Sequence, residues 1–357
     1  MIKLSSENSK KSDRKKDHIE IALKHDVVPK RFISQFDEVV LIHEALPSLD
    51  SSDIDMTLEF IGKKLSAPLI VGAMTGGTAG SEVINGNIAE AVEELGLGMG
   101  IGSQKLALGD SSFEYTFAIA RRKAPNAVIL GNLGASNVFR MSRTEIRRAV
   151  EMIQADALEI HLNALQEFLQ PEGEPNFKGL EEKLDQICDE AGVPVFVKET
   201  GSGISMETAK RLNGKKISGF DIGGAGGTSF AVIEGKRRND DVAEPFYGWG
   251  IPTAASIMEV RSVSDKLIIA SGGVRSGLDA VKAMVLGATL SSMARPLLRP
   301  ATRSSDEVKN FLVKTEEQIR IGMALTGSRD LKALMKVKFL LMGDLAQWVR
   351  QRGIFSL

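Results

Sequence analysis

From position 67 onward the sequence repeats one pattern eight times: a short apolar run followed by a longer amphipathic, charged stretch. The apolar runs are continuous, as expected for parallel strands that helices cover on both faces. The stretches between them are long enough for the crossovers that parallel strands require. Eight such units predict an α/β protein, a closed (β/α)8 TIM barrel, with an open doubly wound sheet as the alternative. The predicted strands are 67–74, 95–102, 127–134, 157–163, 193–199, 217–224, 266–273 and 288–294.

Two segments lie outside the predicted barrel of residues 67–300. Residues 1–66 form an N-terminal extension with a charged, mobile start, then a helix and a polar hairpin-like stretch. Residues 301–357 predict two helices, 304–325 and 328–351, and the second has an apolar face that should pack on the barrel or on a partner subunit. The polar stretch 236–244 lies in a long connection and is a candidate mobile lid or a partly disordered excursion.

Composition narrows the functional classes. The chain has 357 residues and a net charge of -1, so we expect no general attraction to nucleic acid. It has no run of 18 apolar residues and starts with polar residues, so we expect no membrane insertion or export and a cytoplasmic location. Cys188 is the only cysteine, which excludes disulfide frameworks and clustered thiolate metal sites, and we expect it in the core.

Polar and glycine-rich residues follow almost every predicted strand, where barrels of this type carry their catalytic groups. Glycine clusters at 223–227 and 272–273, followed by Ala294 and Arg295, occupy loops that commonly bind phosphate. The helix that Ser276 and Gly277 open would add a favourable dipole. The alternative is that these glycines only form tight turns.

Four further strand ends suit a flat, polar, redox-active ring. Thr75, Ser103, Asn132 and Lys198 should converge on the barrel mouth from different sides. The Lys198 ammonium could lie beside a ring atom where negative charge accumulates. Lys198 could instead form a Schiff base, as lysines of barrel aldolases do.

From residue 14 to about residue 298, the sequence resembles the type 2, FMN-dependent isopentenyl-diphosphate delta-isomerase family. The combination of HLNALQE with an N-terminal RK..H segment is the most specific feature, whereas GNLGA or GGV alone is generic to flavin barrels. The resemblance is carried by RKKDHI at 14–19, HEALP at 43–47, PLIVGAMTGGT at 68–78, GIGSQK at 100–105, GNLGA at 131–135, EIHLNALQE at 159–167, VKETGSGIS at 197–205, DIGGAGGTSF at 221–230, WGIPTA at 249–254 and SGGVRSGLDAVKAMVLGA at 271–288.

The resemblance implies conversion of isopentenyl diphosphate into dimethylallyl diphosphate by a 1,3-proton shift. It implies FMN that is active when reduced, Mg2+, NADPH or NADH as reductant, and a homotetramer or homo-octamer. It assigns to FMN the residues Ala73, Met74, Thr75, Ser103, Asn132, Lys198, Thr228, Gly273, Val274, Arg275, Ala294 and Arg295. It assigns to the substrate Arg14, Lys15, His18, Ser103, Gln104, Lys105, His161, Asn163 and Gln166. Of these, Gln166, His161 and Asn163 would be catalytic, and Glu167 would bind Mg2+.

These assignments agree with the chemistry of such a substrate. Arginine and lysine neutralise a diphosphate by charge-assisted hydrogen bonds, and Mg2+ takes oxygen ligands from carboxylate and phosphate. The hydrocarbon tail needs an apolar cover, for which Trp249 is a candidate. Glu199 and Glu234 are candidates for a proton relay.

Several of these residues also have simpler interpretations. Arg14, Lys15 and Lys16 could belong to a solvated charge run, whereas the resemblance implies that their segment caps the substrate by folding over the diphosphate. His161 could be a structural hydrogen-bond donor, and Glu167 could be a carboxylate at a helix N-terminus. Where the family has arginine and serine, this chain has Lys105 and Gly223; lysine keeps the charge but loses bidentate geometry.

Three other protein classes fit less well. A hydroxy-acid oxidase would need a histidine after the seventh strand, and no histidine follows His161. An enzyme like inosine-monophosphate dehydrogenase would need a cysteine after the sixth strand, and Cys188 lies elsewhere. A barrel kept only as a scaffold would have lost the polar strand ends that this sequence retains.

Overall fold

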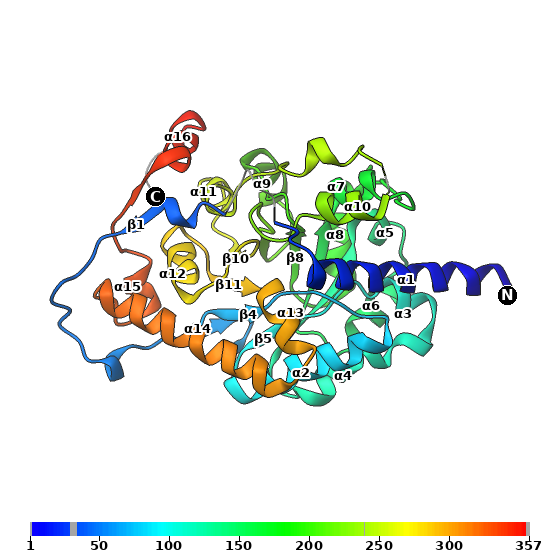
Figure 1. The fold of residues 1–357 in the computed structure, drawn as a ribbon, viewed down its shortest axis with the longest axis horizontal. Coiled ribbons are helices and arrows are strands. Elements are labelled where there is room, and N and C mark those ends of the chain that lie inside the picture. The colour runs from blue at the N-terminus through cyan, green and yellow to red at the C-terminus, as the bar shows by residue number, and fades with distance from the viewer. Residues whose placement is uncertain (1, 29–33, 239, 355–357) are drawn as a thin grey trace.

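The computed structural model describes residues 2–28, 34–238 and 240–354. Eight parallel strands close into a barrel in which the first strand, β4, pairs with the last, β11 (Figure 1). The (β/α)8 prediction is therefore confirmed, and the open doubly wound sheet is excluded. The barrel strands are β4 (Leu69–Val71), β5 (Gly98–Gly100), β6 (Val128–Gly134), β7 (Ala157–Leu162), β8 (Val195–Glu199), β9 (Gly219–Asp221), β10 (Leu267–Ala270) and β11 (Leu290–Met293).

Helices surround the barrel, and their ends follow from local sequence. Ser142 and Glu145 form a capping box that begins α6, and α2 ends where Gly96 takes a left-handed conformation. The helices that follow successive barrel strands bury an apolar face against those strands. They are α2 (Ala79–Leu95), α3 (Lys105–Gly109), α4 (Tyr115–Lys123), α5 (Ala135–Val138), α6 (Arg143–Met152), α7 (Ala164–Leu169), α8 (Leu180–Ala191), α9 (Met206–Asn213), α10 (Phe230–Arg238), α11 (Thr253–Arg261), α12 (Gly277–Val285) and α13 (Arg295–Ala301).

A β-hairpin closes the N-terminal end of the barrel. Strands β2 (Leu58–Phe60) and β3 (Lys63–Leu65) pair around a two-residue turn whose Ile61 and Gly62 both have positive φ. Phe60 and Leu65 are fully buried against apolar residues from the starts of the barrel strands, and the Phe60 ring lies 5.7 Å from that of Phe196. The predicted hairpin is thus present and seals this end.

The N-terminal helix α1 (Ile2–Lys24) lies across the opposite end of the barrel (Figure 1). It contacts α3, α10 and α13, which follow three different strands. The start of the chain, expected to be mobile, is already helical from Ile2. None of the described helices is long and apolar enough to cross a membrane.

The C-terminal region differs from the sequence prediction. The expected helix 304–325 is present as α14 (Ser305–Leu325), which packs on α2, α12 and α13. The expected helix 328–351 is wrong. That segment forms α15 (Leu331–Leu334), β12 (Phe339–Leu341) and α16 (Gly343–Gln351), and β12 pairs antiparallel with β1 (Val39–Leu41). Tertiary pairing overrides helical periodicity here, and Gly343, which has a positive φ, begins α16 soon after the strand ends.

Short 3-10 turns complete the structure. They are η1 (Phe36–Glu38), η2 (Ser51–Asp53), η3 (Ser111–Phe113) and η4 (Glu244–Phe246). The candidate lid 236–244 begins inside α10 and ends in η4, and the Arg238 guanidinium donates to the Leu169 carbonyl at 2.6 Å. Asn239, in the middle of this stretch, lies outside the described residues. Cys188 is half-buried on α8 beside the main core rather than within it.

Candidate active site

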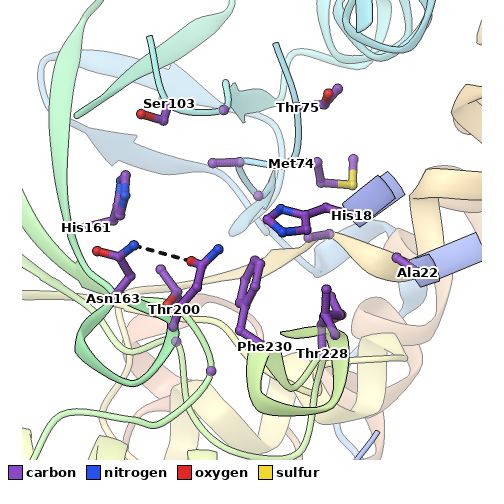
Figure 2. A pocket seen from close by; sticks show the side chains of 18 of the residues that line it. His18, Ala22, Met74, Thr75, Ser103, His161, Asn163, Thr200, Thr228 and Phe230 are labelled. Atoms are coloured by element: carbon purple, nitrogen blue, oxygen red, sulfur yellow. Dashed lines mark hydrogen bonds between the residues drawn. The ribbon is translucent and has the colours of Figure 1, made fainter. Parts of the chain in front are cut away.

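A cavity of about 1080 Å³ opens at the C-terminal ends of the strands, beneath α1. All eight barrel strands, or the loops that follow them, contribute to its lining. Figure 2 shows His161 and Asn163 on one side of this space, His18 and Phe230 on the other, and Thr75 and Ser103 along a third edge. Its size exceeds that of most single-ligand pockets, so it has room for a cofactor and a small substrate together.

The cavity brings together every residue that the resemblance assigns to FMN, substrate or Mg2+ except Gln104. The Gln104 side chain is fully buried and points toward α6, where its Nε2 donates to the Ala149 carbonyl at 2.7 Å. Its Oε1 accepts from the backbone N–H of Asn132 at 3.0 Å. We therefore correct the substrate assignment of Gln104: the chain turns into α3 at this residue, so the side chain supports Asn132 from behind.

Helix α1 places two cations over the cavity. Lys15 Nζ donates to the carbonyls of Gly76 and Ser103 at 2.7 and 2.9 Å and lies 5.4 Å from the Phe117 ring centroid. Burial, aided by the neighbouring Arg14 charge, lowers the pKa of Lys15 to about 7. Arg14 Nη1 lies 3.4 Å from Gln170 Oε1. These two residues are therefore not part of a merely solvated charge run.

His18 and Gln166 meet at a buried carboxylate, Glu234. Glu234 Oε1 lies 2.9 Å from His18 Nε2 and 3.4 Å from Gln166 Nε2, and Arg237 donates to Oε2 at 2.6 Å. Burial opposes ionisation of Glu234, but its contacts with His18 and Arg237 outweigh burial and lower its pKa. A carboxylate, an imidazole and an amide thus form one cluster at the cavity wall.

Asn163 connects this cluster with Glu167. Its Nδ2 donates to Gln166 Oε1 at 3.3 Å and to Glu167 Oε1 at 2.9 Å, while its own buried Oδ1 has no partner among the described residues. Glu167 lies in the first turn of α7, and its Oε2 accepts from the backbone N–H of Glu174. Glu167 is thus consistent both with the helix N-terminal interpretation and with the metal interpretation.

His161 is held from the floor of the cavity. Its Nδ1 lies 2.7 Å from Asn132 Oδ1. Burial, together with the positive charges of Lys198, Lys15 and Arg14, lowers the pKa of His161 to about 4. The ring is therefore neutral at pH 7. With Asn132 Oδ1 accepting, the hydrogen-bond network assigns the proton to Nδ1 and leaves Nε2 as an acceptor.

Two carboxylates beside Lys198 differ in their surroundings. Lys198 Nζ donates to Asp221 Oδ2, which makes a buried ion pair. Glu199 Oε2 instead accepts three backbone N–H groups, from Thr200, Gly201 and Ser202, at 2.5 to 2.6 Å. Burial raises the pKa of Glu199 to about 7 although these hydrogen bonds oppose the shift. Glu199 therefore shapes the loop after β8, and it stays a candidate for a proton relay because it lines the cavity.

The glycine loops contact each other backbone to backbone. A Cβ on Gly227 would lie 2.6 Å from the Gly273 nitrogen, and one on Gly273 would lie 2.7 Å from the Gly226 carbonyl carbon. Glycine is required at Gly273 also because its φ is +75°. Close packing of turns, the simpler interpretation, therefore explains part of this glycine content.

The same loops also offer unused donors to an anion. Within the described chain, the N–H groups of Gly227 and Gly273 have no protein acceptor, and the buried Ser292 Oγ at the cavity has none either. The start of α12 is different from what we expected. The N–H groups of Arg275 and Ser276 already donate to Asp279, so this helix end is internally satisfied. The donors present fit a phosphate on the glycine loops.

The acidic loop after α7 neutralises cations at the cavity mouth. Glu174 pairs with Lys105 at 3.3 Å, and Glu172 pairs with Arg237 at 2.5 Å. The described residues include no group of three or more histidine, cysteine, aspartate or glutamate side chains that could hold a metal. A metal at Glu167 would therefore take most of its ligands from substrate and water.

Most of the apolar residues that line the cavity were not predicted from the sequence. Trp249, expected to cover the alkene, is 62% exposed, packs on Phe246 and does not line the cavity. Phe230 occupies the wall instead, edge-on to His18 at 5.8 Å. The sequence feature that could have identified Phe230 is its position at the start of the helix that follows the glycine loop. Other missed apolar lining residues are Ile19, Ala22, Val28, Ile233 and Leu298.

Fold and site together define a flavin-type (β/α)8 barrel. The family model for FMN-dependent dehydrogenases matches residues 154–339. Two solved structures share the fold: a putative lactate oxidase of Pediococcus acidilactici (TM-score 0.65, 16% identity, 87% of this chain and 86% of that one) and a mandelate oxidase (TM-score 0.64, 18% identity, 93% and 98%). At this identity they establish the fold alone.

Relatives of higher identity specify the family. A protein named isopentenyl-diphosphate delta-isomerase from Ignicoccus hospitalis is 45% identical over 97% of this chain and 98% of its own length. Another of that name from Archaeoglobus fulgidus is 44% identical over 96% of this chain and 99% of its own length. The chain belongs to the isopentenyl-diphosphate delta-isomerase family.

Proposed function

We propose that this protein interconverts isopentenyl diphosphate and dimethylallyl diphosphate by a 1,3-proton shift, using reduced FMN, in isoprenoid biosynthesis. One observation carries the proposal: a single cavity combines a cationic region, formed by Arg14, Lys15 and Lys105, with an apolar wall and a lysine at its floor. Family membership favours this reaction over a hydroxy-acid oxidase, for which no histidine follows β10.

The cationic region would hold the diphosphate. Arg14 and Lys15 come from the helix that covers the cavity, and Lys105 comes from the loop after β5. A diphosphate would raise the pKa of Lys15 again, because an anion favours the charged ammonium. It would also compete with Glu174 for Lys105. The neutral His161 presents an acceptor, so on our proposal the arriving anion makes it take up a proton and donate from Nε2.

The substrate's five-carbon tail offers no polar handle, so the apolar wall must orient it. Phe230, Met74 and Leu298 line the cavity and are suited to this role. Bound FMN would supply, when reduced, an electron-rich ring with an exchangeable proton. Protonation of the alkene requires an acid beside the tail, and the cluster of Glu234, His18 and Gln166 can hold or return a proton there.

The residues that fit FMN lie on the remaining strands. Lys198 and Asn132 occupy the floor, where a ring edge could accept the ammonium's hydrogen bond. The N–H groups of the glycine loops, together with Ser292 and Arg295, would hold the phosphate. The other FMN assignments remain proposals, supported by their position in the lining: Ala73, Met74, Thr75, Ser103, Thr228, Gly273, Val274, Arg275 and Ala294.

We propose Mg2+ at Glu167, shared with the diphosphate. Mg2+ in enzymes commonly uses one or two carboxylates plus substrate phosphate and water, which agrees with a single glutamate here. NADPH or NADH is the proposed reductant. We also propose a homotetramer or homo-octamer. Exposed apolar residues support it: Val40 lies on β1, Leu340 lies on β12, which pairs with β1, and Met342 follows β12 directly. Sedimentation would measure the size of the assembly.

An activity comparison tests the proposed function. The purified chain is incubated without oxygen with FMN, Mg2+, a chemical reductant and isopentenyl diphosphate, and in parallel with oxygen, oxidised FMN and L-lactate or L-mandelate. We expect dimethylallyl diphosphate in the first reaction and no oxygen consumption in the second. Turnover of a hydroxy acid without isomerisation would replace the isomerase by the oxidase alternative.

A further inference from the structure

Four polar side chains from adjacent strands meet inside the barrel just below the cavity. Asn132 (β6), Glu159 (β7), Lys198 (β8) and Asp221 (β9) form what we call the polar layer, and each is at most 9% exposed. Strand register sets Asn132 beside Glu159 and Lys198 beside Asp221. Interior layers of such barrels are usually filled by branched apolar residues, so three ionisable groups here need an explanation.

The side chains of the polar layer are linked through two sets of contacts. Asn132 Nδ2 donates to Glu159 Oε2 at 3.1 Å, and the charge of the nearby Asp221 acts on the Glu159 carboxyl. Asp221 accepts from Lys198 Nζ on one oxygen and from Ser271 Oγ on the other. At the far end Asn132 Oδ1 faces His161. Lys198 and Asn132 therefore connect the polar layer to the floor of the cavity.

Counting charges locates a proton in this layer. It holds one ammonium and two carboxyl groups, and two ionised carboxylates would leave an unpaired buried negative charge. Two neighbouring carboxylates in one buried layer also repel each other, and a proton on one of them removes that repulsion. Asp221 has the ammonium and a hydroxyl as donors, whereas Glu159 receives only an amide N–H. The proton therefore belongs on Glu159.

The electrostatic surroundings agree with this placement. Burial raises the pKa of Glu159 to about 8; Lys198 opposes the shift, and Asp221 adds to it. Burial opposes the charge on Lys198, but Asp221, Glu159 and Glu199 together raise its pKa, so it stays an ammonium. His161, the remaining titratable neighbour, is neutral.

We propose that Glu159 is a neutral carboxylic acid that donates a hydrogen bond to Asp221, and that this pair positions Lys198 and Asn132 under the bound flavin ring. This inference rests on the FMN assignment of the proposed function. Lys198 then has one countercharge instead of two. The floor stays neutral overall and does not repel the negative charge that reduction brings to the ring. Glu159 and Asp221 are positioning residues that act through Lys198.

Two isosteric variants of the full chain separate the partners. Glu159→Gln keeps a donor and an acceptor and changes no charge if Glu159 is neutral, so FMN affinity at pH 7 should stay within about twofold of wild type. Asp221→Asn removes the countercharge of a buried ammonium and should weaken FMN binding at least about tenfold, measured by flavin fluorescence. Equal losses in both variants would overturn the proposal. Should Asp221→Asn fail to fold, Ser271→Ala, which removes a donor to the same carboxylate, takes its place and should weaken binding more than Glu159→Gln does.

The pH dependence of FMN affinity distinguishes the proposed role of Glu159 from a merely structural one. In the wild type, ionisation of Glu159 near pH 8 adds a negative charge beneath the ring, so FMN affinity should fall across that range. In Glu159→Gln the profile should lose this step. Parallel profiles would contradict the assignment of the proton.

Infrared spectra of the flavin-free protein test the carboxyl pair without depending on the proposed function. We expect a protonated-carboxyl C=O band at pH 7 that weakens in Glu159→Gln. Glu199 contributes to the same band, so the difference between the two proteins is the quantity to measure. Asp156→Asn, at a carboxylate paired with Arg121 and Lys63 near the closed end of the barrel, should leave the band unchanged.

An unchanged band in Glu159→Gln would overturn the acid–carboxylate pair. A changed band in Glu159→Gln, combined with unaltered FMN affinity in Asp221→Asn, would overturn only the positioning role. Neither result depends on whether isomerisation occurs.

Discussion

The two ends of the barrel are built from the same eight strands but with opposite kinds of side chain. At the N-terminal end, the buried side chains of Phe60 and Leu65 of the hairpin cover the strands with apolar surface. At the other end, polar strand ends and α1 enclose a large cavity that holds buried ions such as Lys198. The comparison indicates that the closed end maintains the barrel, while the open end concentrates costly buried charges for binding and chemistry.

The largest stability effect should come from the closed end. Phe60→Ala would remove a fully buried ring that packs on Phe196 and should lower the free energy of unfolding by about 3–5 kcal/mol. Denaturant unfolding measures this. FMN affinity at a temperature where the variant stays folded should equal that of wild type, and a marked loss of affinity would break the division between the two ends.

At the open end, Lys198→Ala should act mainly on the cofactor. A hydrogen bond from a charged group contributes about 1.5–3 kcal/mol, so FMN affinity should fall roughly 10- to 150-fold. Flavin titration of the freshly prepared apo-protein provides the measurement. Normal flavin retention in this variant would count against a ring-edge role for Lys198.

Glu167→Gln should have a narrower effect. Replacing a carboxylate ligand by a neutral amide should raise the Mg2+ concentration for half-maximal activity about tenfold or more, while FMN binding is spared. Glu182→Gln, at an exposed position on α8, is the matched control. If Glu167→Gln keeps the wild-type Mg2+ dependence, the metal assignment is removed and the helix N-terminal interpretation stands.

The smallest expected effect is a pH dependence at Lys15. Its pKa in the free protein is about 7, so the ammonium fraction falls as pH rises through 7, and the KM for the diphosphate should rise between pH 6.5 and pH 8.5 by several-fold up to about tenfold. The stability change has the opposite sign. Because the folded pKa lies below the ordinary value of 10.5, docking of α1 weakens as pH falls from about 10.5 to 7. Lys15→Arg should remove the KM change, because arginine stays charged.

The closed end and the barrel itself could be predicted from the sequence to a large extent. Continuous apolar runs and their spacing defined the strands, and strand ends pointed to most of the cavity lining. The C-terminal segment could not be predicted, because the pairing of Phe339–Leu341 with Val39–Leu41 joins residues some 300 positions apart and competes with helical periodicity.

Side-chain direction accounts for the other differences at the open end. Ser103 and Lys105 face the cavity, but Gln104 between them faces α6, and the sequence pattern does not distinguish these directions. Of the polar layer, Asn132 and Lys198 were predicted from sequence, but Glu159 and Asp221 were not, although both are charged residues inside otherwise apolar strands. Charged residues in such positions are seldom fully buried without partners, so their presence predicts polar partners on neighbouring strands.

The central claim is that reduced flavin at the open end moves a proton on a substrate held by the cationic region. It is tested most directly by NMR of isopentenyl diphosphate in D2O under anaerobic conditions, with Mg2+ and with FMN either oxidised or reduced. Our account predicts deuterium-labelled dimethylallyl diphosphate with reduced FMN and no conversion with oxidised FMN. Equal conversion in both states, or tight FMN binding without conversion in either, would contradict it.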